Sequence, residues 1–307
     1  MRSTWVLLGL ALGCTTLVGT GYAQRRGGGD APKAAGEAAK VYVKCEFEGD
    51  GNVENFQGPV AWSDDPGGAL GSGGAMKITT QKDGATAERY IKWEDNDTTI
   101  AFMIFSHGVT SAYCQGMANK AGKNLHAYFK TEPQDQWVFV TVKAASLIGF
   151  GGGASSPGES YKNFMFHLEG TDKAVEEPYL LVDNIVIYAG EDGKPPTEPP
   201  AELTVNFYKE KKLASVNWKA AKDDVGVYRY ELHRSDTPEF TPAKATLLAT
   251  VYDTYYEDGR TTAGKTYYYK VVGKDLGGFV VSSAEVKYTA PPETGTAPAA
   301  AGKKTEF

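Results

Sequence analysis

Polar and aromatic side chains that could hold a sugar recur at alternate positions in three segments of this 307-residue chain, 111–117, 124–130 and 161–168. Alternate residues of a strand point to opposite faces, so one face of each segment is apolar and the other is not. Tyrosine rings stack on the C–H faces of sugars, while amides and imidazoles bind hydroxyls. The candidate ligand residues are Tyr113, Gln115, His126, Tyr128, Asn163 and His167.

Two further interpretations of this face remain open. It is an ordinary half-exposed sheet surface, or one covered by the glycine-rich loop 149–158. Met103, Phe105 and His107 follow the same alternation and extend the face, which would then carry three of the four histidines. A transition-metal site would require their nitrogens to converge to about 2.1 Å from one ion, which spacing alone does not establish.

Catalytic motifs are absent from the sequence. Glycoside hydrolysis uses two carboxylates across a cleft, and the E-x-D-x-x-E arrangement common in jelly-roll hydrolases does not occur. The nearest acidic cluster, EDND at 94–97, is typical of a turn. Neither G-x-S-x-G, H-E-x-x-H nor a phosphate loop is found. We therefore expect that the protein is not an enzyme.

The first 23 residues have the pattern of a secretory signal peptide. Arg2 precedes a short apolar run, and small residues end it at Gly21-Tyr22-Ala23. Cleavage after Ala23 would release an extracellular or periplasmic protein, and lipid anchoring through Cys14 is the alternative. No second apolar stretch is long enough to span a membrane. Residues 24–40 and 291–307 are Gly/Ala-rich and polar, which predicts a flexible leader and a disordered tail.

Cys45 and Cys114 are the only cysteines beyond the signal sequence. An even number in an exported chain favours a disulfide, which would stabilise the fold by about 4 kcal/mol in the loop-entropy view. The alternative is two separately buried thiols, because Cys45 lies on the apolar side of its segment.

Charge is spread unevenly over the chain. Residues 41–190 hold 19 acidic and 11 basic residues, a net charge of −8, whereas residues 200–290 hold 12 and 13, a net charge of +1. Phosphate binding needs clustered Lys and Arg, so nucleic acid is not an expected partner. An acidic first half suits a neutral ligand or a bound cation.

The remaining sequence predicts two all-β domains, 41–190 and 200–290. Helical periodicity is nearly absent, and the proline-rich segment 191–199 predicts an extended spacer between the domains. Short alternating segments with Gly-rich connections are typical of β-sandwiches. In the first domain we predict strands at 41–47, 75–80, 99–105, 111–117, 124–130, 137–142, 161–168 and 179–188.

Residues 41–189 resemble the carbohydrate-binding jelly-roll modules of bacterial polysaccharide-degrading enzymes. The motifs CEFEGDG, GGALGSGGAMKIT, DQWVFVTV and YLLVDNIVIY occur in that order. The resemblance implies a structural Ca²⁺ held by Glu48 and Asp183, with carbonyls near 72–74 completing the oxygen shell. Glu46 and Asp50 are secondary candidates, and the alternative is solvated carboxylates at strand ends.

Residues 200–290 resemble a fibronectin type III domain. Its core Trp corresponds to Trp218, its third-strand aromatic to Tyr230, and its tyrosine corner to Tyr267. We therefore expect a secreted, non-catalytic binding protein whose jelly roll recognises a neutral polysaccharide or cell-surface glycan, with the second domain as a spacer. The alternative is a structural or adhesive surface protein that contacts other proteins without binding sugar.

Overall fold

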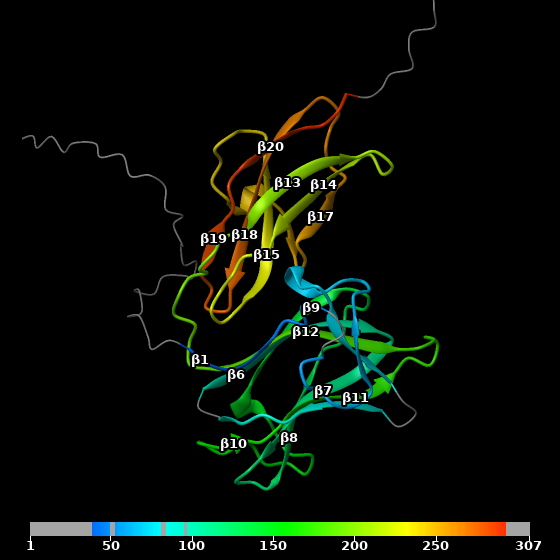
Figure 1. Cartoon of the computed structure of the whole chain (residues 1–307), viewed down its shortest axis with the longest axis vertical. Coiled ribbons are helices and arrows are strands. Elements are labelled where there is room, and N and C mark those ends of the chain that lie inside the picture. The colour runs from blue at the N-terminus through cyan, green and yellow to red at the C-terminus, as the bar shows by residue number, and fades with distance from the viewer. Residues whose placement is uncertain (1–38, 50–52, 81–83, 95–96, 293–307) are drawn as a thin grey trace, which may run out of the picture.

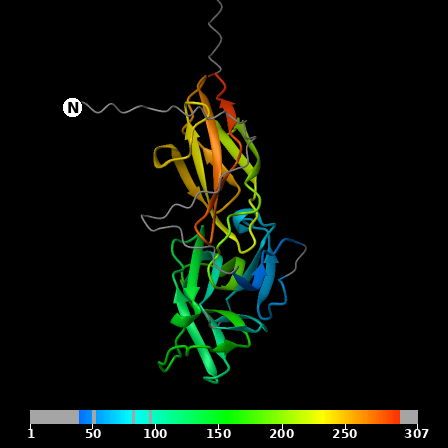
Figure 2. The same ribbon diagram turned by 90° about the vertical axis from the view of Figure 1, so that its left-hand side faces the viewer.

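The computed structural model describes residues 39–49, 53–80, 84–94 and 97–292. The predicted signal peptide with Cys14, nearly all of the leader, most of the tail and Asp50 lie outside the described residues. The chain forms two β-sandwiches, which lie one above the other in Figures 1 and 2. We call residues 39–190 the first sandwich and residues 200–290 the second.

The first sandwich is a jelly roll of two antiparallel sheets. The inner sheet, which faces the second sandwich, has the order β2-β3-β12-β6-β9, with β1 also paired to β12. The outer sheet has the order β4-β11-β7-β10-β5, with β8 paired to β7. The four strands β1-β12-β6-β9 of the inner sheet and the four strands β4-β11-β7-β8 of the outer sheet form the jelly roll. Numbered one to eight along the chain, they have the order 1-8-3-6 in one sheet and 2-7-4-5 in the other, which is the jelly-roll order. The inner strands are β1 (Lys40–Cys45), β2 (Val60–Ser63), β3 (Ala75–Thr79), β6 (Thr98–His107), β9 (Trp137–Lys143) and β12 (Tyr179–Ala189), and the outer strands are β4 (Ala85–Arg89), β5 (Trp93–Glu94), β7 (Val109–Ala118), β8 (Lys123–Phe129), β10 (Ser160–Tyr161) and β11 (Phe164–Thr171).

Alternation on each strand builds the core between these sheets. Phe102 of the inner sheet and Phe166 of the outer sheet are both fully buried, and their rings meet edge to face at 5.0 Å. Leu125 and Ala127 of β8 face the same core. Their neighbours His126 and Tyr128 therefore point away from it. The predicted all-β sandwich fold is confirmed.

The second sandwich has the strand arrangement of a fibronectin type III domain. One sheet has the order β13-β14-β17 and the other β16-β15-β18-β19, with β20 also paired to β18. The bounds are β13 (Ala201–Tyr208), β14 (Leu213–Lys219), β15 (Val227–Ser235), β16 (Leu247–Val251), β17 (Tyr255–Asp258), β18 (Thr266–Asp275), β19 (Val280–Ser282) and β20 (Val286–Thr289). Three short 3₁₀ turns complete the described elements: η1 (Ala69–Gly71), η2 (Ala144–Ser146) and η3 (Lys244–Thr246).

Aromatic residues hold the second sandwich together as expected from the sequence. Trp218 is 5% exposed, and its ring meets Tyr230 edge to face at 5.6 Å. The Tyr267 hydroxyl accepts a hydrogen bond of 2.9 Å from the backbone N–H of Thr262, which is the tyrosine-corner contact. The predicted roles of all three aromatic residues are confirmed.

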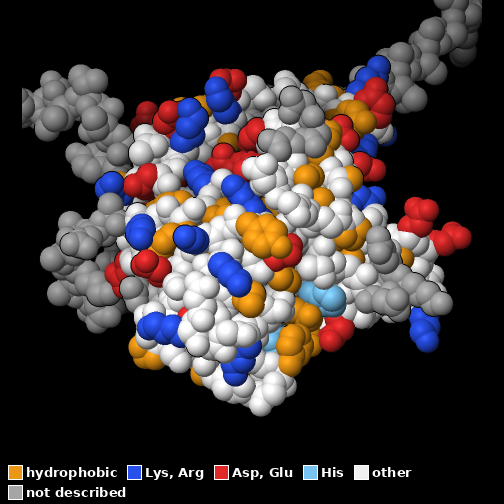
Figure 3. Space-filling model, turned by 60° about the horizontal axis from the view of Figure 1, so that its bottom comes forward, with side chains coloured by type: hydrophobic (Ala, Val, Ile, Leu, Met, Phe, Trp, Pro, Cys, Tyr) orange, Lys and Arg blue, Asp and Glu red, His pale blue; other side chains and the backbone are white. Residues whose placement is uncertain are grey.

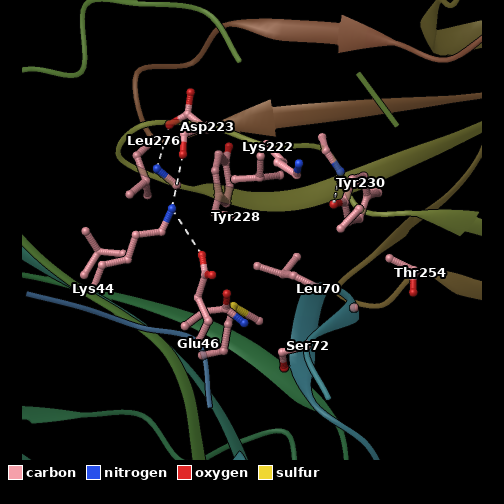
Figure 4. A pocket seen from close by; sticks show the side chains of 18 of the residues that line it. Lys44, Glu46, Leu70, Ser72, Lys222, Asp223, Tyr228, Tyr230, Thr254 and Leu276 are labelled. Carbon is pink, nitrogen blue, oxygen red and sulfur yellow. Dashed lines mark hydrogen bonds and ion pairs between the residues drawn. The ribbon is translucent and has the colours of Figure 1, made fainter. Parts of the chain in front are cut away.

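The two sandwiches are in direct contact, so the prediction of an extended spacer is wrong. The second sandwich packs on the side of the inner sheet that points away from the core of the first sandwich. There the rings of Phe139 and Tyr228 have centroids 4.7 Å apart. The linker does not hold them apart because it pairs with the second sandwich, through the bridge between Glu198 and Lys222. A cleft of about 460 Å³ remains at one side of the junction (Figure 4).

Within the described residues, the structure has no helix with the length and apolar character that a membrane span requires.

Candidate functional site

The outer sheet brings five of the six predicted ligand residues together on its solvent side. Tyr113 of β7 lies directly opposite Tyr128 of β8 and, on its other side, His167 of β11. One step along the strands, Gln115 lies opposite His126 in the same way. The five side chains thus form two adjacent rows across three strands, and we call this surface the Tyr/His face.

Ring contacts make this face a continuous aromatic layer. Tyr113 stacks on His167 at 4.8 Å and meets Tyr128 at 5.2 Å. Phe150, from the loop after η2, stacks on His126 at 3.8 Å between ring centroids. Phe150 is 63% exposed and Tyr128 is 51% exposed, so these two rings form its accessible part. Figure 3 shows histidine side chains next to hydrophobic ones at this end of the molecule.

Hydrogen bonds orient the polar groups of the face. The carboxylate of Glu169 accepts hydrogen bonds from the Tyr128 hydroxyl at 3.0 Å and the Ser111 hydroxyl at 3.1 Å. Nδ1 of His167 lies 2.7 Å from the Thr86 hydroxyl. Oε1 of Gln115 and Nδ1 of His126 are buried, and neither has a hydrogen-bond partner among the described residues. Phe150 of the loop 149–158 lies over His126, so the alternative of a face covered by this loop holds for this part of the surface.

The histidines of this face are held neutral. Desolvation lowers the pKa of His126 and of His167 below the usual value, and the charge of Glu169 opposes this only in part. A neutral imidazole has one donor and one acceptor nitrogen. The face can therefore exchange hydrogen bonds with hydroxyl groups without presenting a positive charge.

Asn163 lies apart from the open surface of the face. It is 4% exposed, and its side-chain oxygen accepts a hydrogen bond of 2.6 Å from the backbone N–H of Met117. Its amide nitrogen donates to Glu88 at 2.5 Å. The side chain thus ties β7 to Glu88 of β4, and both ends of its amide already bond to protein groups.

The expected extension to Met103, Phe105 and His107 is wrong. All three lie on β6 of the inner sheet, on the opposite side of the sandwich. Nδ1 of His107 contacts Asp135 at 2.7 Å and its ring stacks on Tyr179. Alternation shows that a side chain points away from the core, but it does not show which sheet its strand joins. Because His107 lies on the inner sheet and His126 and His167 on the outer sheet, the three histidines do not converge.

The predicted disulfide between Cys45 and Cys114 is also wrong, because the structure has both as buried free thiols. The sulfur of Cys45 accepts a hydrogen bond of 2.7 Å from Arg89 of β4. Cys45 ends β1 of the inner sheet, whereas Cys114 lies on β7 of the outer sheet. Burial raises the pKa of both thiols to about 12, so neither is reactive.

Glu48 and Asp183, the predicted calcium ligands, do approach the same loop. The Asp183 carboxylate is fully buried and accepts hydrogen bonds from the backbone N–H of Ala69 at 2.8 Å, from the Ser72 hydroxyl and from the backbone N–H of Asn184. Desolvation raises the pKa of Asp183 to about 8. Protein donors thus satisfy this carboxylate, and calcium binding at Glu48 and Asp183 stays a prediction.

Sequence reasoning missed two residues of the Tyr/His face. Phe150 stands within the glycine run 149–153, and an isolated aromatic residue in such a loop was a usable signal. Glu169 lies two residues after His167 on the same strand, but the predicted strand ended at 168 whereas β11 continues to Thr171. Extending the alternation by one step would have found it.

Comparisons with known proteins give short matches. No family model matches the chain. A segment of 66 residues, 22% of the chain, is 41% identical to an amylopullulanase of Thermoanaerobacterium saccharolyticum, and 67 residues, also 22% of the chain, are 42% identical to that of Thermoanaerobacterium thermosulfurigenes. These matches span only 5% and 3% of the length of the two enzymes.

Solved structures are similar at low scores. A Fn3-like protein from Clostridium thermocellum is 26% identical over 31% of this chain and 92% of its own, with a TM-score of 0.27. A β-1,2-glucanase from Parabacteroides distasonis is 13% identical over 84% of this chain and 40% of its own, with a TM-score of 0.35.

Proposed function

We propose that this chain is a secreted, non-catalytic binding protein whose Tyr/His face recognises a neutral glycan. A sugar ring would stack on Tyr128 and Phe150, and its hydroxyls would bond to His167 and Glu169. Other surface proteins are the alternative partners, and they would make the chain an adhesive or structural protein.

The observation that carries this proposal is the composition of the Tyr/His face. Stacked aromatic rings lie beside neutral hydrogen-bonding groups, which is what sugar recognition requires. The net charge of −8 over residues 41–190 disfavours acidic polysaccharides.

The matched enzymes support the same ligand class. Amylopullulanases are named for pullulan and amylose-type polymers, which are neutral polysaccharides. A chain that shares a segment of similar sequence with such enzymes and also has an exposed aromatic face is suited to a role as an accessory to polysaccharide-active enzymes.

The test is calorimetric titration of the mature chain with a panel of soluble neutral glucans, including pullulan and maltooligosaccharides. Binding should be lost on Tyr128→Ala, because that substitution removes a stacking ring from the accessible surface. Tyr208→Ala, on the second sandwich and 37% exposed, is the matched control that should keep affinity. No binding to any glycan, or equal affinity in Tyr128→Ala and wild type, would contradict the proposal.

We also propose that the predicted Ca²⁺ at Glu48 and Asp183 serves structure rather than glycan recognition. Titration of the EDTA-treated chain with CaCl₂ should show a binding step that Asp183→Asn removes. An isotherm that Asp183→Asn leaves unchanged would contradict this.

A further inference from the structure

Four aspartates from three separate segments meet beside the junction of the two sandwiches. Asp192 lies in the linker, Asp223 and Asp224 lie in the loop between β14 and β15, and Asp275 ends β18. One carboxylate oxygen from each of Asp192, Asp223 and Asp224 lies within 4.8 Å of the others. Asp275 is close enough for its charge to interact with Asp192 and Asp223.

Burial distinguishes this group from ordinary surface carboxylates. Asp275 is fully buried, Asp192 is 6% exposed and Asp223 is 9% exposed. On each of the three, one carboxylate oxygen is buried with no hydrogen-bond partner among the described residues: Oδ2 of Asp192, Oδ1 of Asp223 and Oδ2 of Asp275. A buried, unpaired carboxylate oxygen is costly, so three in one place indicate a missing positive partner.

Backbone groups hold the other oxygen of these carboxylates. Oδ2 of Asp223 accepts hydrogen bonds from the N–H groups of Val225 at 2.9 Å and Gly226 at 2.6 Å. Oδ1 of Asp275 accepts one from Phe279 at 2.7 Å, and Oδ1 of Asp192 accepts a long one from Lys194 at 3.3 Å. The turns thus fix each side chain by one oxygen and leave the second for another ligand.

Among the described residues, no lysine or arginine forms an ion pair with the buried carboxylates of Asp192, Asp223 and Asp275. The ammonium of Lys194 lies 3.2 Å from Asp224, but both side chains are largely in solvent. The ammonium of Lys44 donates to the backbone carbonyl of Asp223 rather than to its carboxylate (Figure 4). A cation bound between these carboxylates would supply the positive partner that their unpaired oxygens lack.

We propose that Asp192, Asp223 and Asp224, with Asp275 beside them, form a Ca²⁺ site that fixes the junction between the two sandwiches. The ligands are all carboxylate oxygens, which suit a hard cation and not Zn²⁺. Ca–O distances of 2.3–2.6 Å place ligand atoms on opposite sides of an ion about 4.6–5.2 Å apart. One carboxylate oxygen from each of Asp192, Asp223 and Asp224 lies within 4.8 Å of the others, close enough to share one ion. Water would complete the coordination shell.

The position of the ion explains what it would do. Val225 and Leu276, next to the proposed ligands, pack against Val186 and Tyr188 of the first sandwich. An ion that joins the linker, the β14–β15 loop and the end of β18 would hold these contact residues in place. The orientation of the Tyr/His face relative to the second sandwich would then depend on Ca²⁺.

The test uses the mature chain freed of metal with EDTA and then titrated with CaCl₂ by calorimetry, with thermal unfolding measured in parallel. Wild type should bind Ca²⁺ at the junction and melt at a higher temperature when it is bound. Asp192→Asn and Asp275→Asn keep the side-chain shape and should each weaken binding at least ten-fold.

Asp183→Asn is the control that separates this site from the one predicted at Glu48. It should leave the junction binding step and its melting shift unchanged. MgCl₂ in place of CaCl₂ tests the choice of ion and should give a weaker response. The proposal is overturned if wild type binds no Ca²⁺, if Asp192→Asn and Asp275→Asn bind it as wild type does, or if Mg²⁺ binds more tightly than Ca²⁺.

Discussion

Each sheet of the first sandwich has one face that points away from its core, and these two faces differ in what covers them. On the inner sheet, Met103, Phe139 and Val186 carry apolar side chains that the second sandwich covers. On the outer sheet, the equivalent side is the Tyr/His face, where Tyr128 and Phe150 stay accessible. The strands on both sheets alternate with the same period, and only the chemistry of the outward side chains differs.

This difference shows how the side chains of a sheet face decide whether it packs against another domain or stays open to a ligand. Met103 is 1% exposed because another domain buries it, and burial of such an apolar side chain drives stable packing. The Tyr/His face combines rings with polar groups, and permanent burial of those groups would require a matching partner for each. The first face therefore serves assembly, while the second suits a ligand that supplies hydrogen bonds.

The largest expected effect is on the second sandwich, which must be folded in order to cover the inner sheet. Trp218→Ala should destabilise it by about 3–5 kcal/mol, because a large core aromatic is deleted. Denaturant unfolding of the full chain, followed for the second sandwich, measures this change. Phe207→Ala, 41% exposed on β13, should change stability by only about 0.5 kcal/mol. An unmoved midpoint for Trp218→Ala would show that this residue is not in the core.

A direct test of the covered face is Met103→Ala. Met103 packs between the sandwiches, so its truncation should cost about 2–5 kcal/mol of folding free energy. Met117→Ala is the matched control, since Met117 is a half-buried methionine on β7 of the outer sheet, and its cost should stay under about 1 kcal/mol. If chemical denaturation shows equal losses of folding free energy for Met103→Ala and Met117→Ala, the two faces do not differ as described.

The Tyr/His face should also respond to pH. The pKa of His126 and of His167 is lowered in the folded state by desolvation. In the unfolded chain histidine titrates near 6.5, so the unfolded state takes up protons first as the pH falls. The histidine contribution to stability should therefore be level above about pH 6.5, fall below it, and level off below the folded-state pKa. Buried carboxyls with raised pKa values, such as Asp183, shift total stability in the opposite direction over the same range. The measurement is therefore the difference in melting temperature between wild type and His126→Gln/His167→Gln from about pH 8 to 5, which should shrink as the pH falls below about 6.5.

The smallest effect is expected from Tyr128→Phe. It removes one exposed hydrogen bond to Glu169 and keeps the ring, so stability should change by less than about 1 kcal/mol. Glycan affinity should change little compared with its loss in Tyr128→Ala, because stacking is retained. Calorimetry with the same glycan compares the two variants. Loss of binding in Tyr128→Phe would assign recognition to the hydroxyl rather than to the ring.

Local patterns predicted the fold well because each strand carries its own alternation. All eight predicted strands of the first sandwich are present, as are the buried Trp218 and the Tyr267 corner. The missed strands β2, β4 and β5 have five residues or fewer. Segments this short, whose apolar positions are few, give little period-2 signal.

Sheet membership and burial beyond the core could not be predicted in the same way. His107 and His167 follow identical local rules but lie on different sheets. The cysteines both face the core, and only the sheet assignment shows that Cys45 lies on β1 of the inner sheet and Cys114 on β7 of the outer sheet. The four junction aspartates are separated by up to 83 positions in the sequence, from Asp192 to Asp275, and only the docked structure brings them together.

The central claim is that the Tyr/His face, and not the covered face, binds a neutral glycan. Hydrogen–deuterium exchange of the mature chain, with and without the tightest glucan of the panel, tests it directly. We predict slower exchange in peptides from 109–129 and 147–171, and no change in peptides from 98–107 and 137–143. Protection confined to the inner-sheet peptides or to the second sandwich would contradict the account.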